Sequence, residues 1–244
     1  IHPHTISNEL DGTLDLETVE KKIRASDLHY PPTRLIALEN THNYCMGSPI
    51  KPEYMQQAGN LAKRYNLQIH VDGARIFNAA VAMEVDVKDL VSEADSVMFC
   101  LSKGLSAPVG SLVCGNKEFI NKARKWRKMV GGGMRQSGHL AAAGIIALGE
   151  LVDRLKEDHS NAQALAQGLA GLKGIVLKPE LIKTNIIFFR LEHPTLSPEI
   201  FLKKLESQGI KILMMQVGVF RAVLHREISE SQIERVIHTS EELT

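Results

Sequence analysis

The chain has 244 residues, of which 44% are hydrophobic and 23% are charged, and its formal net charge is +1. This composition is typical of a globular protein with its own core, and the near-neutral charge excludes a broad field that would attract nucleic acid or an anionic membrane. No apolar stretch reaches the roughly 18 residues that a membrane span needs, and no secretory signal is visible. Three cysteines without CxxC spacing predict neither a zinc site nor a disulfide framework, so we expect a reducing, cytoplasmic location with the mitochondrion as the alternative.

The first two thirds of the chain alternate between helical and strand patterns. Asp15 is a suitable N-cap for a helix that begins at Leu16. The elements predicted after it are a strand at 34–39, a helix at 51–65, a strand at 67–71 that ends at Asp72, a short helix at 87–94, strands at 97–101 and 110–114, and a helix at 117–128. This alternation predicts an α/β fold, with a mostly parallel sheet covered by helices on both faces.

The pattern changes in the last part of the chain. Helical patterns run from about 136 to 171. They are followed by a strand at 185–190, a helix at 198–207, candidate strands at 210–214 and 220–224, and a final helix from about 230. We therefore predict a large domain over 1–172 and a small C-terminal α+β domain over 173–244.

Polar residues stand where three of the predicted strands end. Asp72 ends one strand, Lys103 follows another, and Glu39 to Asn43 follow a third. Each is weak evidence alone, because Asp-Gly is a common turn pair and a lysine after a strand is usually solvated. In open α/β sheets, however, ligands bind at the carboxyl ends of the strands. Together, the residues predict a carboxylate and an amine that face one ligand.

That pair of groups suits pyridoxal phosphate, which needs an amine for its aldehyde and a carboxylate beside its ring nitrogen. The carboxylate keeps the ring nitrogen protonated, which makes the ring an electron sink. Because the amine must be uncharged to attack, we expect Lys103 to be buried near a cation. Arg75 could supply that cation or bind the ring oxygen. No metal ligand set is predicted.

Four segments carry a resemblance to a known family: TRLIALENTHN at 33–43, HVDGARIFNAA at 70–80, CLSKGLSAPVGSLVCG at 100–115 and WRKMVGGGMRQSGHLAAAGI at 126–145. They closely resemble the threonine aldolases, which belong to the β-eliminating-lyase group of fold-type-I pyridoxal-phosphate enzymes. The resemblance runs from about His29 to Ala147 and extends more weakly to the end. It implies a large cofactor-binding domain followed by a small domain.

The resemblance also implies roles for individual residues. Lys103 would be the Schiff-base lysine and Asp72 the partner of the ring nitrogen. Arg75 would contact the cofactor's phenolic oxygen or the substrate. His29, in HYPPTRL, resembles the family histidine near the substrate's β-hydroxyl, and His42 is an alternative for that role.

Two further arginines have implied roles. Arg221, in VFRAVLH, resembles the arginine whose guanidinium forms a bidentate fork with the substrate carboxylate. Arg135 follows three glycines and could lie near the phosphate, across a subunit interface. The basic helix at 117–128 is better explained as a solvated or intersubunit face than as a nucleic-acid site.

The resemblance begins within the family's large domain. In the family, the preceding region supplies a Gly-Thr pair for the phosphate, a histidine stacked on the ring and part of the tetramer contact, and none of these has a match here. We therefore expect either an excerpt of an ordinary enzyme or a truncated chain with weakened cofactor binding.

The implied activity is retro-aldol cleavage of L-threonine or L-allo-threonine to glycine and acetaldehyde by a homo-oligomer, a tetramer in the family. One alternative is a related pyridoxal-phosphate β-eliminating lyase. Another is a truncated, catalytically inactive chain that only oligomerises or binds a partner.

Overall fold

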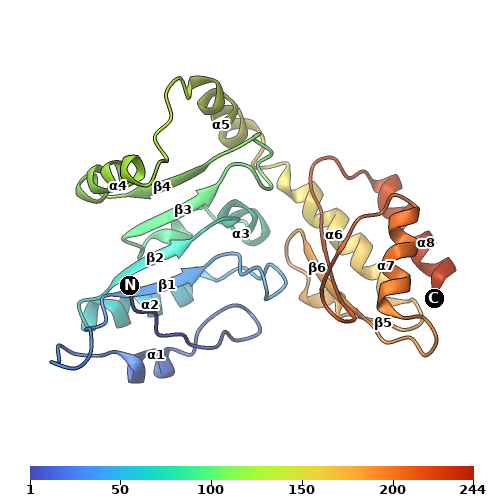
Figure 1. The fold of residues 1–244 in the computed structure, drawn as a ribbon, viewed down its shortest axis with the longest axis horizontal. Coiled ribbons are helices and arrows are strands. Elements are labelled where there is room, and N and C mark those ends of the chain that lie inside the picture. Colours follow the sequence, from blue (N-terminus) through green and yellow to red (C-terminus); the bar gives the residue numbers. More distant parts are fainter. The chain divides into compact units, whose positions relative to one another are not determined.

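The computed structural model describes all residues 1–244 and divides them into two compact units. The first unit contains 1–45 and 49–152, and the second contains 46–48 and 153–244 (Figure 1). The boundary therefore lies between Val152 and Asp153, and the predicted boundary near residue 172 is wrong. The reason is that α6 (Leu155–Ala170) buries Leu165 and Leu169 in the core of the small sheet.

The first unit is built on a four-stranded sheet in the order β1-β2-β3-β4 (Figure 1). Its strands are β1 (Leu35–Glu39), β2 (Gln68–Asp72), β3 (Ser96–Cys100) and β4 (Ser111–Gly115). β1, β2 and β3 run parallel, and β4 pairs antiparallel with β3. The mostly parallel sheet agrees with the prediction and aligns the carboxyl ends of three strands.

Helices connect these strands. They are α1 (Leu16–Lys22), α2 (Pro52–Arg64), α3 (Ile76–Met83), the 3-10 turn η1 (Asp89–Val91), α4 (Lys117–Met129) and α5 (Gly138–Glu150). Asp15 caps α1 as predicted, and its carboxylate accepts a 2.9 Å hydrogen bond from the Thr18 amide. The helix predicted at 87–94 is wrong. Only the 3-10 turn forms, because Asp95 is held to Ile69 by its own amide (2.9 Å) and its carboxylate (2.7 Å), so the chain turns back to the sheet.

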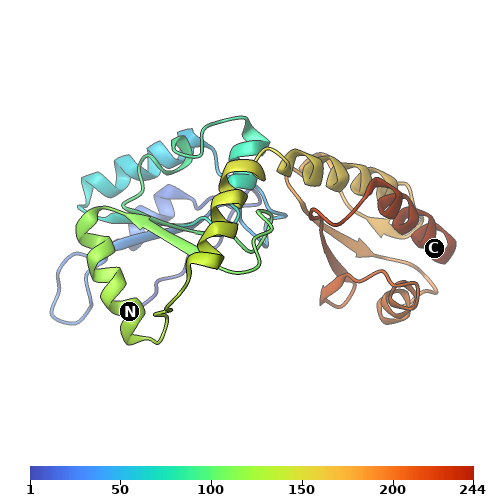
Figure 2. The same cartoon turned by 90° about the horizontal axis from the view of Figure 1, so that it is seen from above.

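Strand alternation gives the sheet two different faces. Ile36, Leu38, Ile69 and Val71 point to one face, where they form a buried core with α2 and α3. Residues between them, including Glu39 and Asp72, point to the opposite face. α4 lies on the opposite side of the sheet from α2 (Figure 2) and approaches it beside β4, where Phe119 contacts Gly115.

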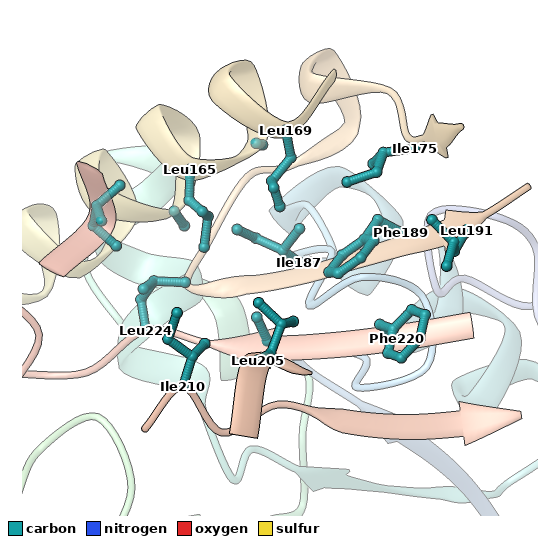
Figure 3. Packing of buried hydrophobic residues seen from close by; sticks show 14 of the residues in the cluster. Leu165, Leu169, Ile175, Ile187, Phe189, Leu191, Leu205, Ile210, Phe220 and Leu224 are labelled. Carbon is teal, nitrogen blue, oxygen red and sulfur yellow. The ribbon is translucent and has the colours of Figure 1, made fainter. Parts of the chain in front are cut away.

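The second unit contains a four-stranded antiparallel sheet in the order β5-β6-β8-β7. Its elements are α6, β5 (Ile175–Val176), the 3-10 turn η2 (Pro179–Leu181), β6 (Ile186–Leu191), α7 (Pro198–Ser207), β7 (Leu213–Gln216), β8 (Val219–Val223) and α8 (Glu230–Leu243). Phe189, Phe201 and Phe220 form an aromatic cluster with centroids 5.2 to 6.4 Å apart. Figure 3 shows Leu165 and Leu169 of α6 above this core.

The second unit thus has a separate apolar core, as expected of the predicted small α+β domain. None of the helices in either unit is long and apolar enough to cross a membrane.

Candidate active site

The carboxyl ends of β1, β2 and β3 meet at one edge of the first sheet. Glu39 pairs in register with Asp72, and Asp72 pairs with Met98. Two backbone hydrogen bonds extend this alignment: the Asn40 amide donates to the Asp72 carbonyl at 2.9 Å, and the Gly73 amide donates to the Met98 carbonyl at 2.8 Å. The polar strand ends identified in the sequence therefore lie side by side.

Asp72 is exposed at this edge in a defined orientation. Its Oδ1 accepts a 3.1 Å hydrogen bond from the Ala74 amide, which leaves Oδ2 available to a ligand. Gly73 lets the turn approach β3 closely, since an added Cβ would lie 2.8 Å from the Met98 carbonyl oxygen. Arg75 is half-buried at the start of α3, immediately beyond this turn. The turn thus presents one carboxylate oxygen and brings a guanidinium near the same strand end.

Lys103 lies in a loop that follows β3. The Leu101 amide donates to the Gly110 carbonyl at 2.9 Å, which closes the loop at its base, and the Ser106 amide donates to the Lys103 carbonyl at 2.9 Å. Leu101 is buried, and α5 leaves room for it at Gly144, where an added Cβ would lie 2.9 Å from the Leu101 Cδ1 atom. The loop backbone that carries Lys103 is therefore held by hydrogen bonds and packing.

The base of this loop is tied to the Asp72 turn. The Cys100 amide donates to the Ala74 carbonyl at 3.4 Å, so Lys103 follows the same sheet edge that carries Asp72. The Lys103 side chain is exposed and makes no hydrogen bond or ion pair in the described structure, so the expected burial is not observed. Its amine is accessible to a ligand at this edge.

Glu39 and His42 form a pair of polar side chains at the end of β1. His42 Nε2 lies 3.5 Å from Glu39 Oε2, while the Asn43 amide donates to Glu39 Oε1 at 3.0 Å. His42 Nδ1 accepts a 3.2 Å hydrogen bond from the Cys45 amide. Gly12, with φ +86°, packs so closely that an added Cβ would lie 2.6 Å from the His42 Cβ atom. Sequence reasoning noted His42 and the strand end at Glu39 but did not identify them as a pair.

Glu39, His42 and Asp72 line one groove. A cavity of about 920 Å³ runs along the sheet face and is lined by Glu39, His42, His70 and Asp72, among others. His70 Nδ1 lies 2.8 Å from the Ser96 hydroxyl, below Asp72 on the same face. This edge therefore combines carboxylates and imidazoles, with the Lys103 amine beside it, and can support acid–base chemistry together with covalent attachment of an aldehyde.

Two predicted residues of the first unit are not brought to this edge. His29 is exposed in a loop whose base is the 3.0 Å hydrogen bond from the Thr33 amide to the Arg24 carbonyl, just before the amino end of β1. The strand itself spans about 13 Å, so His29 lies toward the opposite end of the sheet from Asp72. Arg135 is exposed between α4 and α5 and makes no ion pair. The roles predicted for His29 and Arg135 stay predictions.

Arg221 belongs to the second unit. It is half-buried on β8 and pairs in register with Phe188 of β6. Alternation places it on the face opposite Phe220 and Ala222, which point into the core. Its guanidinium thus belongs to the face of the small sheet that α6, α7 and α8 do not cover.

Comparison with known sequences shows which protein family this chain resembles. Residues 1–192 match the beta-eliminating lyase family. The chain is 46% identical over 236 residues to low-specificity L-threonine aldolase 1 of Arabidopsis thaliana, which covers 96% of this chain and 66% of that protein. It is 43% identical over 237 residues to the low specificity L-threonine aldolase of Escherichia coli K12, covering 97% of this chain and 68% of that protein. The chain spans about two thirds of the length of these curated relatives.

Solved structures show the same fold. The Leishmania major threonine aldolase has a TM-score of 0.73 at 18% identity, covering 94% of this chain and 66% of that one. A PLP-dependent aminotransferase from Streptococcus suis has a TM-score of 0.72 at 19% identity, covering 98% and 63%. The fold is that of fold-type-I pyridoxal-phosphate enzymes, and by its sequence the chain belongs to the beta-eliminating lyase family and, within it, to the low-specificity L-threonine aldolases.

Proposed function

We propose that this chain catalyses pyridoxal-phosphate-dependent cleavage of L-threonine or L-allo-threonine to glycine and acetaldehyde. The observation that carries the proposal is the placement of the Asp72 carboxylate and the Lys103 loop at one sheet edge. The names of the relatives support the choice of a β-hydroxy amino acid as the substrate.

The residues at this edge fit the cofactor. Asp72 Oδ2 is available for a protonated ring nitrogen, and Lys103 offers an amine for the aldehyde carbon. Arg75, next to the Asp72 turn, suits the phenolic oxygen. When bound, pyridoxal phosphate accepts the electron pair of the Cα–Cβ bond.

Each side chain then has a definite task. Asp72 would keep the ring nitrogen protonated, and the Lys103 amine would hold the cofactor through its aldehyde carbon. The guanidinium of Arg221 holds the substrate carboxylate through two parallel hydrogen bonds. Fixing the carboxylate orients the Cα–Cβ bond, which lowers the barrier to its cleavage.

We further propose that the chain forms a homo-oligomer. Exposed apolar side chains on the α4–α5 segment support an interface, with Trp126 61%, Val130 79% and Ile145 72% exposed. In such an assembly, the exposed Arg135 would lie near the phosphate of a neighbouring copy.

One experiment separates this function from its alternatives. The purified chain is mixed with pyridoxal phosphate, its visible absorbance is recorded, and L-threonine is added. We expect a protein-bound chromophore and equal amounts of acetaldehyde and glycine. Pyruvate and ammonia formed from a β-substituted amino acid, without acetaldehyde from threonine, would indicate a β-eliminating lyase. A protein that oligomerises but shows no chromophore would indicate a chain that only binds a partner.

A further inference from the structure

Glu39 is a carboxylate at the proposed site to which no role has yet been given. It is the last residue of β1 and the direct register partner of Asp72. Neighbouring strands lie about 4.8 Å apart, and the two residues share one face of the sheet. Both line the same groove. We propose that Glu39 is a catalytic residue that accepts the proton of the substrate's β-hydroxyl, an inference that rests on the proposed function.

The Glu39 carboxylate is held in place but still has hydrogen-bond acceptor sites without a partner. The Asn43 amide binds Oε1 at 3.0 Å, and His42 Nε2 lies 3.5 Å from Oε2. An ionised carboxylate has about four acceptor sites, so further capacity remains. The side chain is 33% exposed, which opens it to the groove. Glu39 can therefore accept one more hydrogen bond without losing its orientation.

His42 supports this carboxylate and does not replace it as the base. Its Nδ1 accepts the hydrogen bond from the Cys45 amide, so the proton of the neutral imidazole lies on Nε2, toward Glu39. Neither ring nitrogen then has a lone pair free for a substrate. His42 is a positioning residue, and its side chain is only 12% exposed.

Four other groups are not assigned as the base, and His70 lies two residues before the end of β2, where its Nδ1 is 2.8 Å from the Ser96 hydroxyl. Asp72 is assigned to the ring nitrogen and Lys103 to the aldehyde carbon. Burial raises the pKa of the Cys45 thiol, and the charges of Asp11 and Glu39 raise it further, so the thiol stays protonated. His29 belongs to the opposite end of the sheet in the same chain. Glu39 is thus the group at this edge with both the charge and the open coordination that the step requires.

The proton balance of the step is complete. The β-hydroxyl O–H bond breaks, and its proton moves to a Glu39 oxygen. The O–H electron pair becomes the second C–O bond of acetaldehyde as the Cα–Cβ bond breaks. The pair from that bond remains with the glycine fragment, whose Cα takes up one proton. One proton leaves the hydroxyl and one joins Cα, so threonine gives glycine and acetaldehyde without an oxidant or reductant.

The test is Glu39→Gln in the full chain with pyridoxal phosphate. Glutamine keeps an oxygen for the Asn43 amide but cannot take the proton, so we expect kcat for threonine cleavage to fall about 100-fold or more. Exchange of the glycine α-proton with D₂O involves no hydroxyl, so this rate should stay near that of the unchanged chain. Glu93→Gln is the matched control, because Glu93 is partly buried in the same unit, where it pairs with Lys63. It should leave both rates unchanged.

His42→Ala tests the positioning role. Loss of an orienting partner typically costs 10- to 100-fold, so kcat for cleavage should fall about tenfold, while glycine exchange persists. In the Glu39→Gln background, His42→Ala should add little, because the two residues act as a unit. Additive losses would contradict the proposed pairing.

The outcomes are distinct. Glu39→Gln with wild-type cleavage would overturn the inference, and an equal loss of cleavage and glycine exchange would overturn it in favour of a structural role. Circular dichroism verifies that each variant is folded. If the unchanged chain itself binds no cofactor or cleaves no threonine, the proposed function fails, and this inference fails with it, before any variant is compared.

Discussion

Gly73 determines how closely the Asp72 turn approaches β3. In Gly73→Ala, the added Cβ would lie 2.8 Å from the Met98 carbonyl oxygen and 3.1 Å from both Ile76 Cβ and Val97 Cγ2. An ordinary contact begins at 3.4 Å, so the backbone must move by about 0.6 Å. That movement strains the 2.8 Å hydrogen bond from the Gly73 amide to Met98.

The expected cost combines overpacking, about 1–3 kcal/mol, with part of a backbone hydrogen bond, about 1 kcal/mol. We therefore expect the free energy of unfolding to fall by about 2–3 kcal/mol in urea titrations followed by far-UV circular dichroism. Cofactor affinity should fall as well, because the turn orients Asp72. Gly149→Ala is the control: no atom lies within 4 Å of its added Cβ in α5, so it should stabilise the chain by up to about 1 kcal/mol. A Gly73→Ala chain as stable as the unchanged protein would refute the packing argument.

Three further predictions concern single residues. Asp72→Asn should retain some cofactor absorbance but lose most turnover, since an amide cannot hold the ring nitrogen protonated; normal turnover in a steady-state assay would remove Asp72 from that role. Arg221→Ala should chiefly raise KM for threonine, and an unchanged KM would separate it from the carboxylate. Burial lowers the pKa of His159 to about 4 from its ordinary 6.5. Between pH 4 and 6.5 the unfolded chain binds more protons at this residue than the folded chain does, so stability should decrease by about 2–3 kcal/mol as pH falls from 6.5 to 4. His159→Gln should flatten this pH dependence in urea titrations, and an unchanged slope would contradict the assignment.

The strand ends were predictable from sequence because each apolar run stops at a polar residue. Asp72 ends β2 as predicted, and Lys103 follows β3, whose observed bounds differ from the prediction by one residue. Parallel strands must align their carboxyl ends, so this local pattern was sufficient to predict that the two residues share an edge. Family resemblance then supplied the chemistry.

Other elements were not accessible to pattern reasoning. The helix at Ile76–Met83 was not predicted, because IFNAAVAM is apolar nearly all round and shows no amphipathic period. The domain boundary was placed too late because α6 continues the helical pattern of α5, although its apolar face packs on the other core. Which core a helix joins is decided by tertiary packing, and the helical period does not reveal it.

Site geometry was the least predictable feature. His29 precedes β1 by a few residues, yet sequence proximity does not tell which end of the strand a loop side chain reaches. The Glu39–His42 pair depends on a loop conformation fixed by the Asn43 and Cys45 amides and by close packing of Gly12. Such contacts arise only from the folded chain.

The central claim is that Lys103 carries pyridoxal phosphate in this chain. The most direct measurement is borohydride reduction of the chain mixed with the cofactor, followed by proteolysis and peptide mass mapping. We expect one pyridoxyl group, attached to Lys103, and no labelled peptide of this kind in Lys103→Ala. A label on another lysine, or no stable label on a chain that still cleaves threonine, would contradict it.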